Sequence, residues 1–433
     1  MTKDRSSQDP ASNNKAFAAS RRRFLQLSGL SAGAAAFGLG AGFGPGLSAA
    51  RAATAARIGF TPYTYASTLS VQIAEAFKVA AAQLGATGES FDGQADSSAQ
   101  LNGINQLIAK NFNGVSLEAV DGGSIRSLAR IAEQNQVYLN HVWNSATWFT
   151  PWDSSEFYAL HIQPNEYEGF GQVTRVLLDA LGGEGTIVRV GGTLNDPSDV
   201  VRTAGADAVI AQYPGIKLAG ELPGDWAPEP AQRAASALLS RYPDTRGIIA
   251  QNDDIATGVI AAIRAIGKVP GKDILVIGTN GTSDAAKRIQ AGTQLASAIN
   301  NPSFIGYTLA ANLYDRINGW KPDPLERSLT FRAEILTRAN VEPYIARYID
   351  LPVSAHFDAN LISRVKSPDN WDPQYELVPT DLDLLWIGQP KPEGYVYPEA
   401  YTKGRSDGSL ERITKLYSDH YKIKILDPSP VKA

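Results

Sequence analysis

The stretch from Thr245 to Gly281 constrains the fold more than any other part of this sequence. It begins with a short apolar run at 248–250, continues through polar residues into apolar residues at three- and four-residue spacing, and ends in the apolar run 274–277. This pattern predicts a strand, a helix and a second strand. Because neither strand alternates with polar residues, we expect both to be buried in a parallel sheet, as in a βαβ unit.

Polar residues follow both of these strands. Asn252 comes directly after the first, and Asn280 comes at the end of the second. Ligands of open α/β sheets bind beyond the carboxyl ends of the strands, so we expect both side chains to face a ligand. The alternative for Asn252 is that it only caps the following helix, which is the interpretation we favour for Asp253.

The same alternation of strand and helix patterns runs through most of the chain. It predicts two doubly wound, parallel-sheet α/β lobes joined by a hinge that the chain crosses more than once. Such crossings suit closure of the lobes about a ligand. The expected strands are 57–61, 114–120, 137–139, 186–190, 216–221 and 292–299, and the expected helices are 69–84, 101–108, 124–133, 167–181, 199–211, 230–240 and 305–317.

The order of these patterns predicts the division of the chain. The last hundred residues contain many prolines and aromatic residues, and we expect an irregular C-terminal extension that wraps the lobes, with one helix at 410–421. The alternative is an extension that contacts a partner or the ligand and limits opening of the cleft. The predicted parts are a removed signal peptide (1–56), an N-terminal lobe (57–162 and 301–320), a C-terminal lobe (163–300 and 321–336) and the extension (337–433).

The N-terminal region carries an export pattern. Three arginines at 21–23 precede Phe24 and Leu25, a Gly/Ala-rich apolar segment follows, and small-residue sites such as 50–52 come next. This order resembles a twin-arginine signal peptide and predicts export by the twin-arginine translocase to the periplasm. A disordered basic tail, the alternative, does not account for the apolar segment and the cleavage sites.

Composition excludes several classes of function. The chain has no cysteine, which excludes disulfides, thiolate metal sites, cysteine catalysis and a lipid anchor on an N-terminal cysteine. Loss of residues 1–56, with seven Lys/Arg and two Asp/Glu, would change the formal net charge from −4 to −9. Such an acidic protein would repel nucleic acid. The four histidines show no metal-site spacing, and we expect neither a metal nor a cofactor.

Five segments together resemble a known family. AQND followed by an apolar helix, and GTNGT about 28 residues further on, are the most specific of them. In this order they are similar to the sugar-binding proteins of ABC importers with the ribose-binding, type I periplasmic fold, over roughly 57–336. The resemblance implies a monomeric binding protein, not an enzyme, that takes a monosaccharide or polyol between its lobes and delivers it to a membrane permease. The segments are GFTPYTYASTLSVQIAEAFKVAAAQLG, GTLNDPSDVVRTAG, AQNDDIATGVIAAIRAIGK, VIGTNGTSDAAKRIQAG and ASAINNPSFIG.

The resemblance also implies which residues contact the ligand. A guanidinium can hold two neighbouring sugar oxygens, and an aromatic face can cover a sugar ring. Without the resemblance, Arg202 would be assigned to a solvated helix face and Trp226 to ordinary packing. The implied ligand-binding residues are Arg202, Trp226, Asn252, Asn280 and Asn300, with Tyr63, Tyr65, Ser67, Leu69 and either His141 or Trp143 from the first lobe.

Two departures from the family pattern leave the ligand class open. Sugar binders often have aspartate where this chain has Asn280 and the segment His141 to Trp143. Such carboxylates balance the arginine, so a sugar acid is the alternative ligand. A partner of a membrane sensor is the alternative role.

Three other classes fit the sequence less well. An exported oxidoreductase would need a G-x-G-x-x-G turn, which is missing after the first strand. A repressor would need a helix-turn-helix in front of Arg57, and a hydrolase would need G-x-S-x-G or a Ser/His/Asp set.

Overall fold

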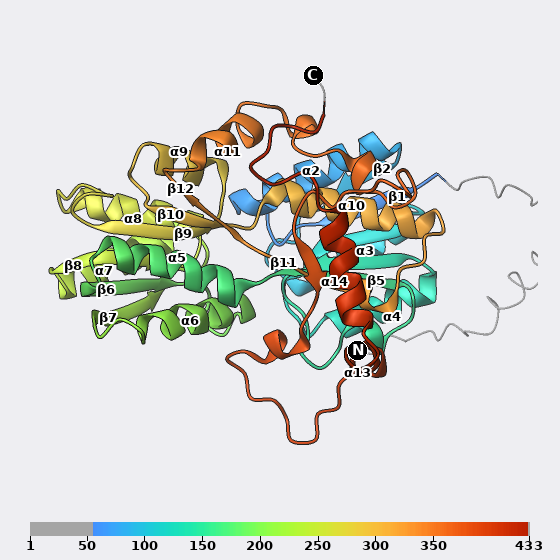
Figure 1. Ribbon diagram of the computed structural model, residues 1–433, viewed down its shortest axis with the longest axis horizontal. Coiled ribbons are helices and arrows are strands. Elements are labelled where there is room, and N and C mark those ends of the chain that lie inside the picture. Colours follow the sequence, from blue (N-terminus) through green and yellow to red (C-terminus); the bar gives the residue numbers. More distant parts are fainter. Residues whose placement is uncertain (1–54, 432–433) are drawn as a thin grey trace, which may run out of the picture. The chain divides into compact units, whose positions relative to one another are not determined.

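The computed structural model describes residues 55–431, which form two β-sheets with helices packed on them (Figure 1). The predicted export signal lies almost entirely outside the described residues. Within them, no helix combines the length and the apolar character needed to cross a membrane.

The first lobe is built on a seven-stranded sheet with the order β13-β11-β5-β4-β3-β1-β2. Its strands β1 to β5 are parallel, and helices separate β1 to β4. The sequence pattern predicted β1, β3 and β4, but not β2 or β5. The elements are β1 (Arg57–Thr61), α2 (Thr68–Leu84), β2 (Thr87–Ser90), α3 (Ser97–Ala109), β3 (Gly114–Glu118), α4 (Ile125–Asn135), β4 (Tyr138–Val142), the 3-10 turn η2 (Pro151–Asp153) and β5 (Tyr158–Pro164).

The second lobe is built on a six-stranded sheet with the order β12-β10-β9-β8-β6-β7. The βαβ unit predicted from Thr245 to Gly281 is β8, α8 and β9, and these two strands are parallel neighbours. The elements are α5 (Glu166–Ala180), β6 (Glu184–Gly191), α6 (Pro197–Ile210), β7 (Gly215–Pro223), α7 (Pro228–Arg241), β8 (Thr245–Ala250), α8 (Asp253–Ala265), β9 (Leu275–Asn280), α9 (Ser283–Gln290) and β10 (Ala296–Ile299).

The chain crosses between the two sheets three times. It passes from β5 to α5, from β10 to α10 (Pro302–Ile317), and from β11 (Ser328–Phe331) to β12 (Glu334–Thr337). The predicted multi-crossing hinge is therefore present. Helix α10 returns to the first lobe and packs against α2, where a Cβ at Gly306 would lie 2.6 Å from the backbone nitrogen of Phe77.

Both sheets are mixed rather than purely parallel, which corrects the prediction. β12 runs antiparallel to β10, and β13 (Leu377–Pro379) runs antiparallel to β11. These short strands add to the sheet edges without a helical crossover, so nothing forces them into the parallel direction. β11 also pairs with β5 in the first sheet, whereas we predicted the whole of 321–336 in the C-terminal lobe.

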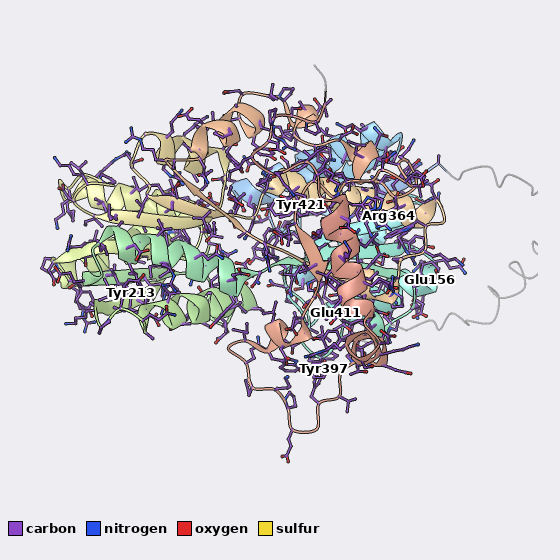
Figure 2. The ribbon with its side chains drawn as sticks, viewed as in Figure 1. Glu156, Tyr213, Arg364, Tyr397, Glu411 and Tyr421 are labelled. Atoms are coloured by element: carbon purple, nitrogen blue, oxygen red, sulfur yellow. The ribbon has the colours of Figure 1, made fainter. Side chains whose placement is uncertain are left out.

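The C-terminal extension is more regular than we predicted. Its last helix, α14 (Ser409–His420), lies where the sequence pattern indicated, but other short elements precede it. Aromatic side chains from this segment are buried, among them Trp371, Tyr375 and Tyr417, and β13 forms the edge of the first sheet. Its Arg364, Glu411 and Tyr421 lie toward the first lobe, away from Tyr213 of the second (Figure 2). The other elements of the extension before α14 are α11 (Val341–Tyr348), η4 (Val353–Ala355), α12 (Ala359–Ile362), η5 (Leu382–Trp386) and α13 (Glu399–Ser406). The 3-10 turn η3 (Pro324–Arg327) lies before β11, outside the extension.

Candidate functional site

A cavity of about 300 Å³ lies where the carboxyl ends of strands from both sheets meet. Both lobes supply its walls, through the turns that follow β1, β3 and β4 and through those that follow β6, β7, β8 and β9. This is the position in which α/β folds bind ligands, and the volume suits a small solute. The polar and aromatic lining includes Tyr63, Ser67, Glu118, Trp143, Asn144, Asp196, Ser198, Arg202, Asp225, Trp226, Asn252 and Asn280.

Most of the predicted ligand residues come together at this cavity. Those that line it are Tyr63, Ser67, Leu69, Trp143, Arg202, Trp226, Asn252 and Asn280. Two of them also cap helices: the Ser67 hydroxyl accepts from Ser70 N, and Asn252 Oδ1 accepts from Ile255 N at 2.7 Å. Asn252 therefore caps the helix with its side-chain oxygen, as the alternative interpretation expected. Its side-chain amide nitrogen remains as the atom that could contact a ligand.

Three of the predicted residues do not line the cavity. Tyr65 is 40% exposed and its hydroxyl pairs with Ser90, because the turn after β1 carries it outward. His141 lies within β4, where its ring pairs with the Tyr158 hydroxyl and stacks on His161. Asn300 is buried behind the cavity wall.

Trp143, two residues after His141, reaches the cavity because the backbone turns there. Its φ of 61° lies in the left-handed region, where non-glycine residues are uncommon. The Trp143 carbonyl accepts a hydrogen bond from His161 Nε2 at 2.9 Å, and the Trp143 backbone nitrogen donates to Ile162 O at 3.2 Å. These contacts with β5 hold the indole at the junction of the two lobes.

Arg202 is placed by the start of α6. Asp196 caps this helix by accepting from Ser198 N at 2.9 Å, and Pro197 occupies its first turn. The Arg202 guanidinium is buried: Nη1 donates to Gln251 O at 2.7 Å, and Nη2 donates to Glu166 Oε1 at 2.7 Å, while Nε donates to Glu166 Oε2.

Neighbouring carboxylates stabilise the charged form of Arg202. Burial lowers the pKa of the guanidinium, but the Glu166 carboxylate, with Asp196 and Asp199 further off, more than compensates and leaves the pKa above its usual value. The guanidinium carbon also lies 5.3 Å from the centre of the Trp226 ring, within cation–π distance.

Trp226 lies in a tight turn whose backbone conformation and packing depend on particular residues. Asp225 and Trp226 have φ values of 51° and 57°, and a Cβ at Gly192 would lie 2.1 Å from the indole. Glycine at 192 is therefore required for Trp226 to lie where it does. The half-buried indole leaves an aromatic face toward the cavity.

Glu118 is a cavity residue that sequence reasoning missed. It ends β3, and its Oε2 accepts from Tyr63 N at 2.9 Å and from the Ser70 hydroxyl at 2.6 Å. Burial raises the pKa of this carboxyl to about 7, which these hydrogen bonds only partly offset. The signal was available, because a lone carboxylate at the end of an apolar strand fits the same strand-end rule that selected Asn252 and Asn280.

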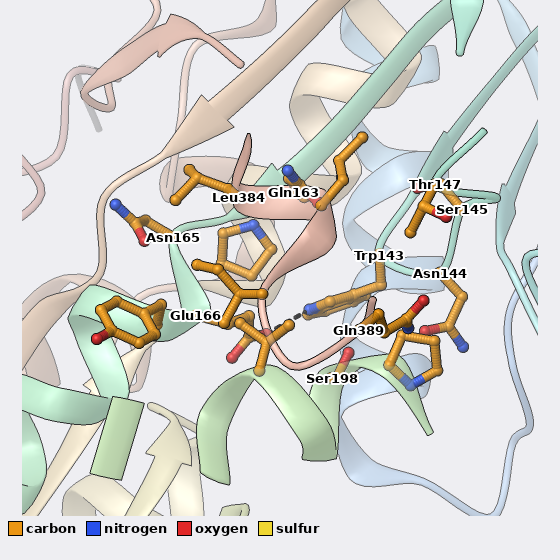
Figure 3. A pocket seen from close by; sticks show the side chains of 16 residues that line it. Trp143, Asn144, Ser145, Thr147, Gln163, Asn165, Glu166, Ser198, Leu384 and Gln389 are labelled. Carbon is orange, nitrogen blue, oxygen red and sulfur yellow. Dashed lines mark hydrogen bonds between the residues drawn. The ribbon is translucent and has the colours of Figure 1, made fainter. Parts of the chain in front are cut away.

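Glu166 was missed as well. It begins α5 directly after the first crossing, where it looks like an ordinary first-turn acid. Its carboxylate accepts from Trp143 Nε1 at 2.9 Å and from Asn300 Nδ2 at 3.4 Å, besides Arg202. Figure 3 shows Trp143 and Glu166 joined in this way.

Trp143 also lines a smaller cavity of about 50 Å³ (Figure 3). The extension closes it with residues from 384 to 389, opposite first-lobe residues such as Gln163 and second-lobe residues such as Val201. The extension therefore contacts both lobes beside the first crossing. No group of three or more metal-binding side chains occurs within residues 55–431.

Comparisons with known proteins agree with this architecture. The family model described as periplasmic binding protein domain matches residues 58–321, more than half of the chain. A xylitol-binding protein of Mycolicibacterium smegmatis is 26% identical over 48% of this chain and 56% of its own length. The D-allose-binding periplasmic protein of Escherichia coli is 33% identical over 36% of this chain and 50% of its own length. The chain thus spans about half the length of these curated relatives.

The fold itself matches solved structures. A periplasmic sugar-binding protein from Pseudomonas fluorescens superposes with a TM-score of 0.64 at 22% identity, covering 76% of this chain and 99% of the other. At that identity the likeness concerns the fold, which is the two-lobed α/β architecture predicted from the sequence.

Proposed function

The chain belongs to the periplasmic binding protein family, and from that premise we propose that it binds a monosaccharide or polyol between its lobes. The observation that carries the proposal is the cavity itself. One arginine, several carboxylates, asparagines and tryptophans from both lobes converge on about 300 Å³. Polyols need many directed donors and acceptors together with an apolar face, and this lining supplies both.

The proposed role is capture rather than catalysis. Two of the relatives are a xylitol-binding and a D-allose-binding protein, and both ligands are small polyhydroxylated molecules. We propose that this chain takes a ligand of the same class and delivers it to the permease of an ABC importer. The three crossings between the lobes support closure about the ligand by hinge motion.

We further propose that the protein works as a monomer in the periplasm after export by the twin-arginine translocase. The arginines at 21–23 with the apolar segment behind them support this route. Replacing Arg21 and Arg22 by lysine should leave the precursor in the cytoplasm, as fractionation of the producing cells would show. Export that continued unchanged would contradict the twin-arginine route.

A thermal-shift screen tests the binding function. The protein should be tested against ribose, allose, xylitol, myo-inositol and their relatives, with nucleotides and amino acids as controls. A ligand at 100 times its dissociation constant should stabilise the protein by about 2.7 kcal/mol. If no sugar or polyol raises the melting temperature and a nucleotide does, the proposed function is wrong.

A further inference from the structure

Glu166 connects three parts of the chain through one buried carboxylate. Its side chain is 8% exposed, and it accepts hydrogen bonds from Trp143 of the first lobe, Arg202 of the second lobe and Asn300 at the second crossing. The carboxylate does not line the large cavity itself; it lies behind the Arg202 guanidinium, which does. Figure 3 shows Glu166 between helix α6 and the Trp143 indole.

The contacts of Arg202 limit what its guanidinium can do for a ligand. A guanidinium has five N–H groups, and three of them are used by Glu166 and by Gln251 O. The edge formed by Nε and Nη2, the edge best suited to a bidentate carboxylate, is already occupied by Glu166. One N–H on Nη1 and one on Nη2 remain for ligand oxygens, but the positive charge that would attract a ligand carboxylate is already matched by Glu166.

The charges around the cavity also disfavour a ligand that carries a carboxylate. Arg202 is the one basic residue among the described residues that line the cavity, and its charge is matched by Glu166. Glu118, Asp196 and Asp225 also line the cavity. A ligand carboxylate would therefore meet a compensated cation and several acids, and like charges repel strongly where water is excluded.

We propose that Glu166 determines the charge selectivity of the cavity, by occupying the Nε/Nη2 edge of Arg202 and balancing its charge, so that uncharged sugars and polyols bind and sugar acids do not. This inference rests on the proposed function and deepens it. The sequence alone favoured a sugar acid as the alternative ligand, because Asn280 and the segment 141–143 lack the expected carboxylates. Glu166 supplies that missing charge from a different element.

The test compares each neutral compound with its own acid. Calorimetry would measure the affinities of wild-type protein and Glu166→Gln for ribose and ribonate, allose and allonate, and xylitol and xylonate. Glutamine keeps the size and one acceptor but removes the charge. We expect the ratio of acid to neutral affinity to rise at least tenfold in Glu166→Gln.

Two control variants separate charge from structure. Glu168→Gln removes a carboxylate in the same first turn of α5, where it bonds Asn165 and Gln172 rather than Arg202, and it should leave the ratio unchanged. Glu166→Asp keeps the charge and should keep the selectivity, even where the shorter side chain weakens all binding. A merely structural Glu166 would give equal losses for acid and neutral ligands in both Glu166 variants.

Each outcome decides the matter. A wild-type protein that binds an acid as tightly as its neutral partner overturns the inference, even if Glu166→Gln does not fold. A ratio that rises less than tenfold in folded Glu166→Gln also overturns it. Wild-type protein that binds none of these compounds contradicts the proposed function instead, so the two failures are distinguishable.

Discussion

The indole Nε1 of Trp143 donates to Glu166 Oε1 across 2.9 Å, and this bond joins the end of β4 in the first lobe to the first residue of α5 in the second. Trp143 also lines both the large cavity and the smaller one closed by the extension. The same side chain therefore lines the cavity, joins the two lobes and donates to the carboxylate that pairs with Arg202.

Trp143→Phe should weaken both stability and ligand binding. Phenylalanine keeps an aromatic face but leaves the buried Glu166 carboxylate without one of its donors, which costs about 1–3 kcal/mol. Urea denaturation would measure the stability, and calorimetry with the best ligand from the thermal-shift screen would measure the affinity. The control is Trp148→Phe, at a tryptophan that is 50% exposed. Equal effects at the two positions would show that the bond to Glu166 contributes nothing.

Arg202→Met should destabilise the protein by about 3–5 kcal/mol, because it leaves the Glu166 carboxylate buried without its partner. The double variant Arg202→Met with Glu166→Met should recover much of this stability, since neither charge then remains. Ligand affinity should stay low in both variants. Urea denaturation of the four proteins in this cycle gives the coupling energy, and strictly additive effects would contradict a coupled pair.

The alternation of strands and helices could be predicted because each helix face and each buried run is a local pattern. The unit from Thr245 to Gly281 is an example: its strands needed no knowledge of their partners. β2 was missed because its sequence, Thr-Gly-Glu-Ser, has no apolar pattern, and β5 was missed because it follows an aromatic segment. β13 depends on β11, about fifty residues away, and short-range patterns do not report such pairing.

The site residues also fall into two groups, those that could be predicted from the sequence and those that could not. Asn252 and Asn280 follow from the strand-end rule, and Arg202 and Trp226 follow from the family resemblance. Glu166 could not be recognised, because its role comes from Arg202, 36 residues further along the chain, and from Trp143 in the other lobe. The sequence left His141 and Trp143 as alternatives, and of the two only Trp143 lines the cavity, because the left-handed turn at Trp143 has no sequence signature in a non-glycine residue.

Glu118 should make stability depend on pH. Its pKa is raised from 4.5 to about 7 in the folded protein, so its contribution is fully present below pH 4.5 and is lost as pH rises through 7. Glu118→Gln mimics the protonated carboxyl and removes this loss. Relative to the wild type, the variant should gain about 2–3 kcal/mol of stability between pH 5 and pH 8.

Urea denaturation at both pH values measures this gain. Glu75→Gln, on the exposed face of α2, makes the same chemical change at the surface and should show no comparable gain. A difference between Glu118→Gln and the wild type that is the same at pH 5 and pH 8 would mean that Glu118 titrates near its ordinary pKa.

The contact between the extension and the second lobe can be tested at Gly388. Its φ is 74°, and a Cβ there would lie 2.4 Å from Val200 Cγ1 on α6, the helix that carries Arg202. Gly388→Ala should therefore lower the stability by about 1 kcal/mol through left-handed backbone strain. In addition, the new methyl group should either clash with Val200 or push residues 384–389 away from α6.

The matched control is Gly394→Ala in the same segment, where φ is 78° and no atom lies within 4 Å of the added Cβ. Gly388→Ala should be the more destabilising by about 1–3 kcal/mol in urea denaturation, and it should expose the segment to proteolysis. Equal losses of stability at the two glycines would mean that the extension does not pack on α6. The extension would then not restrain the movement of the lobes.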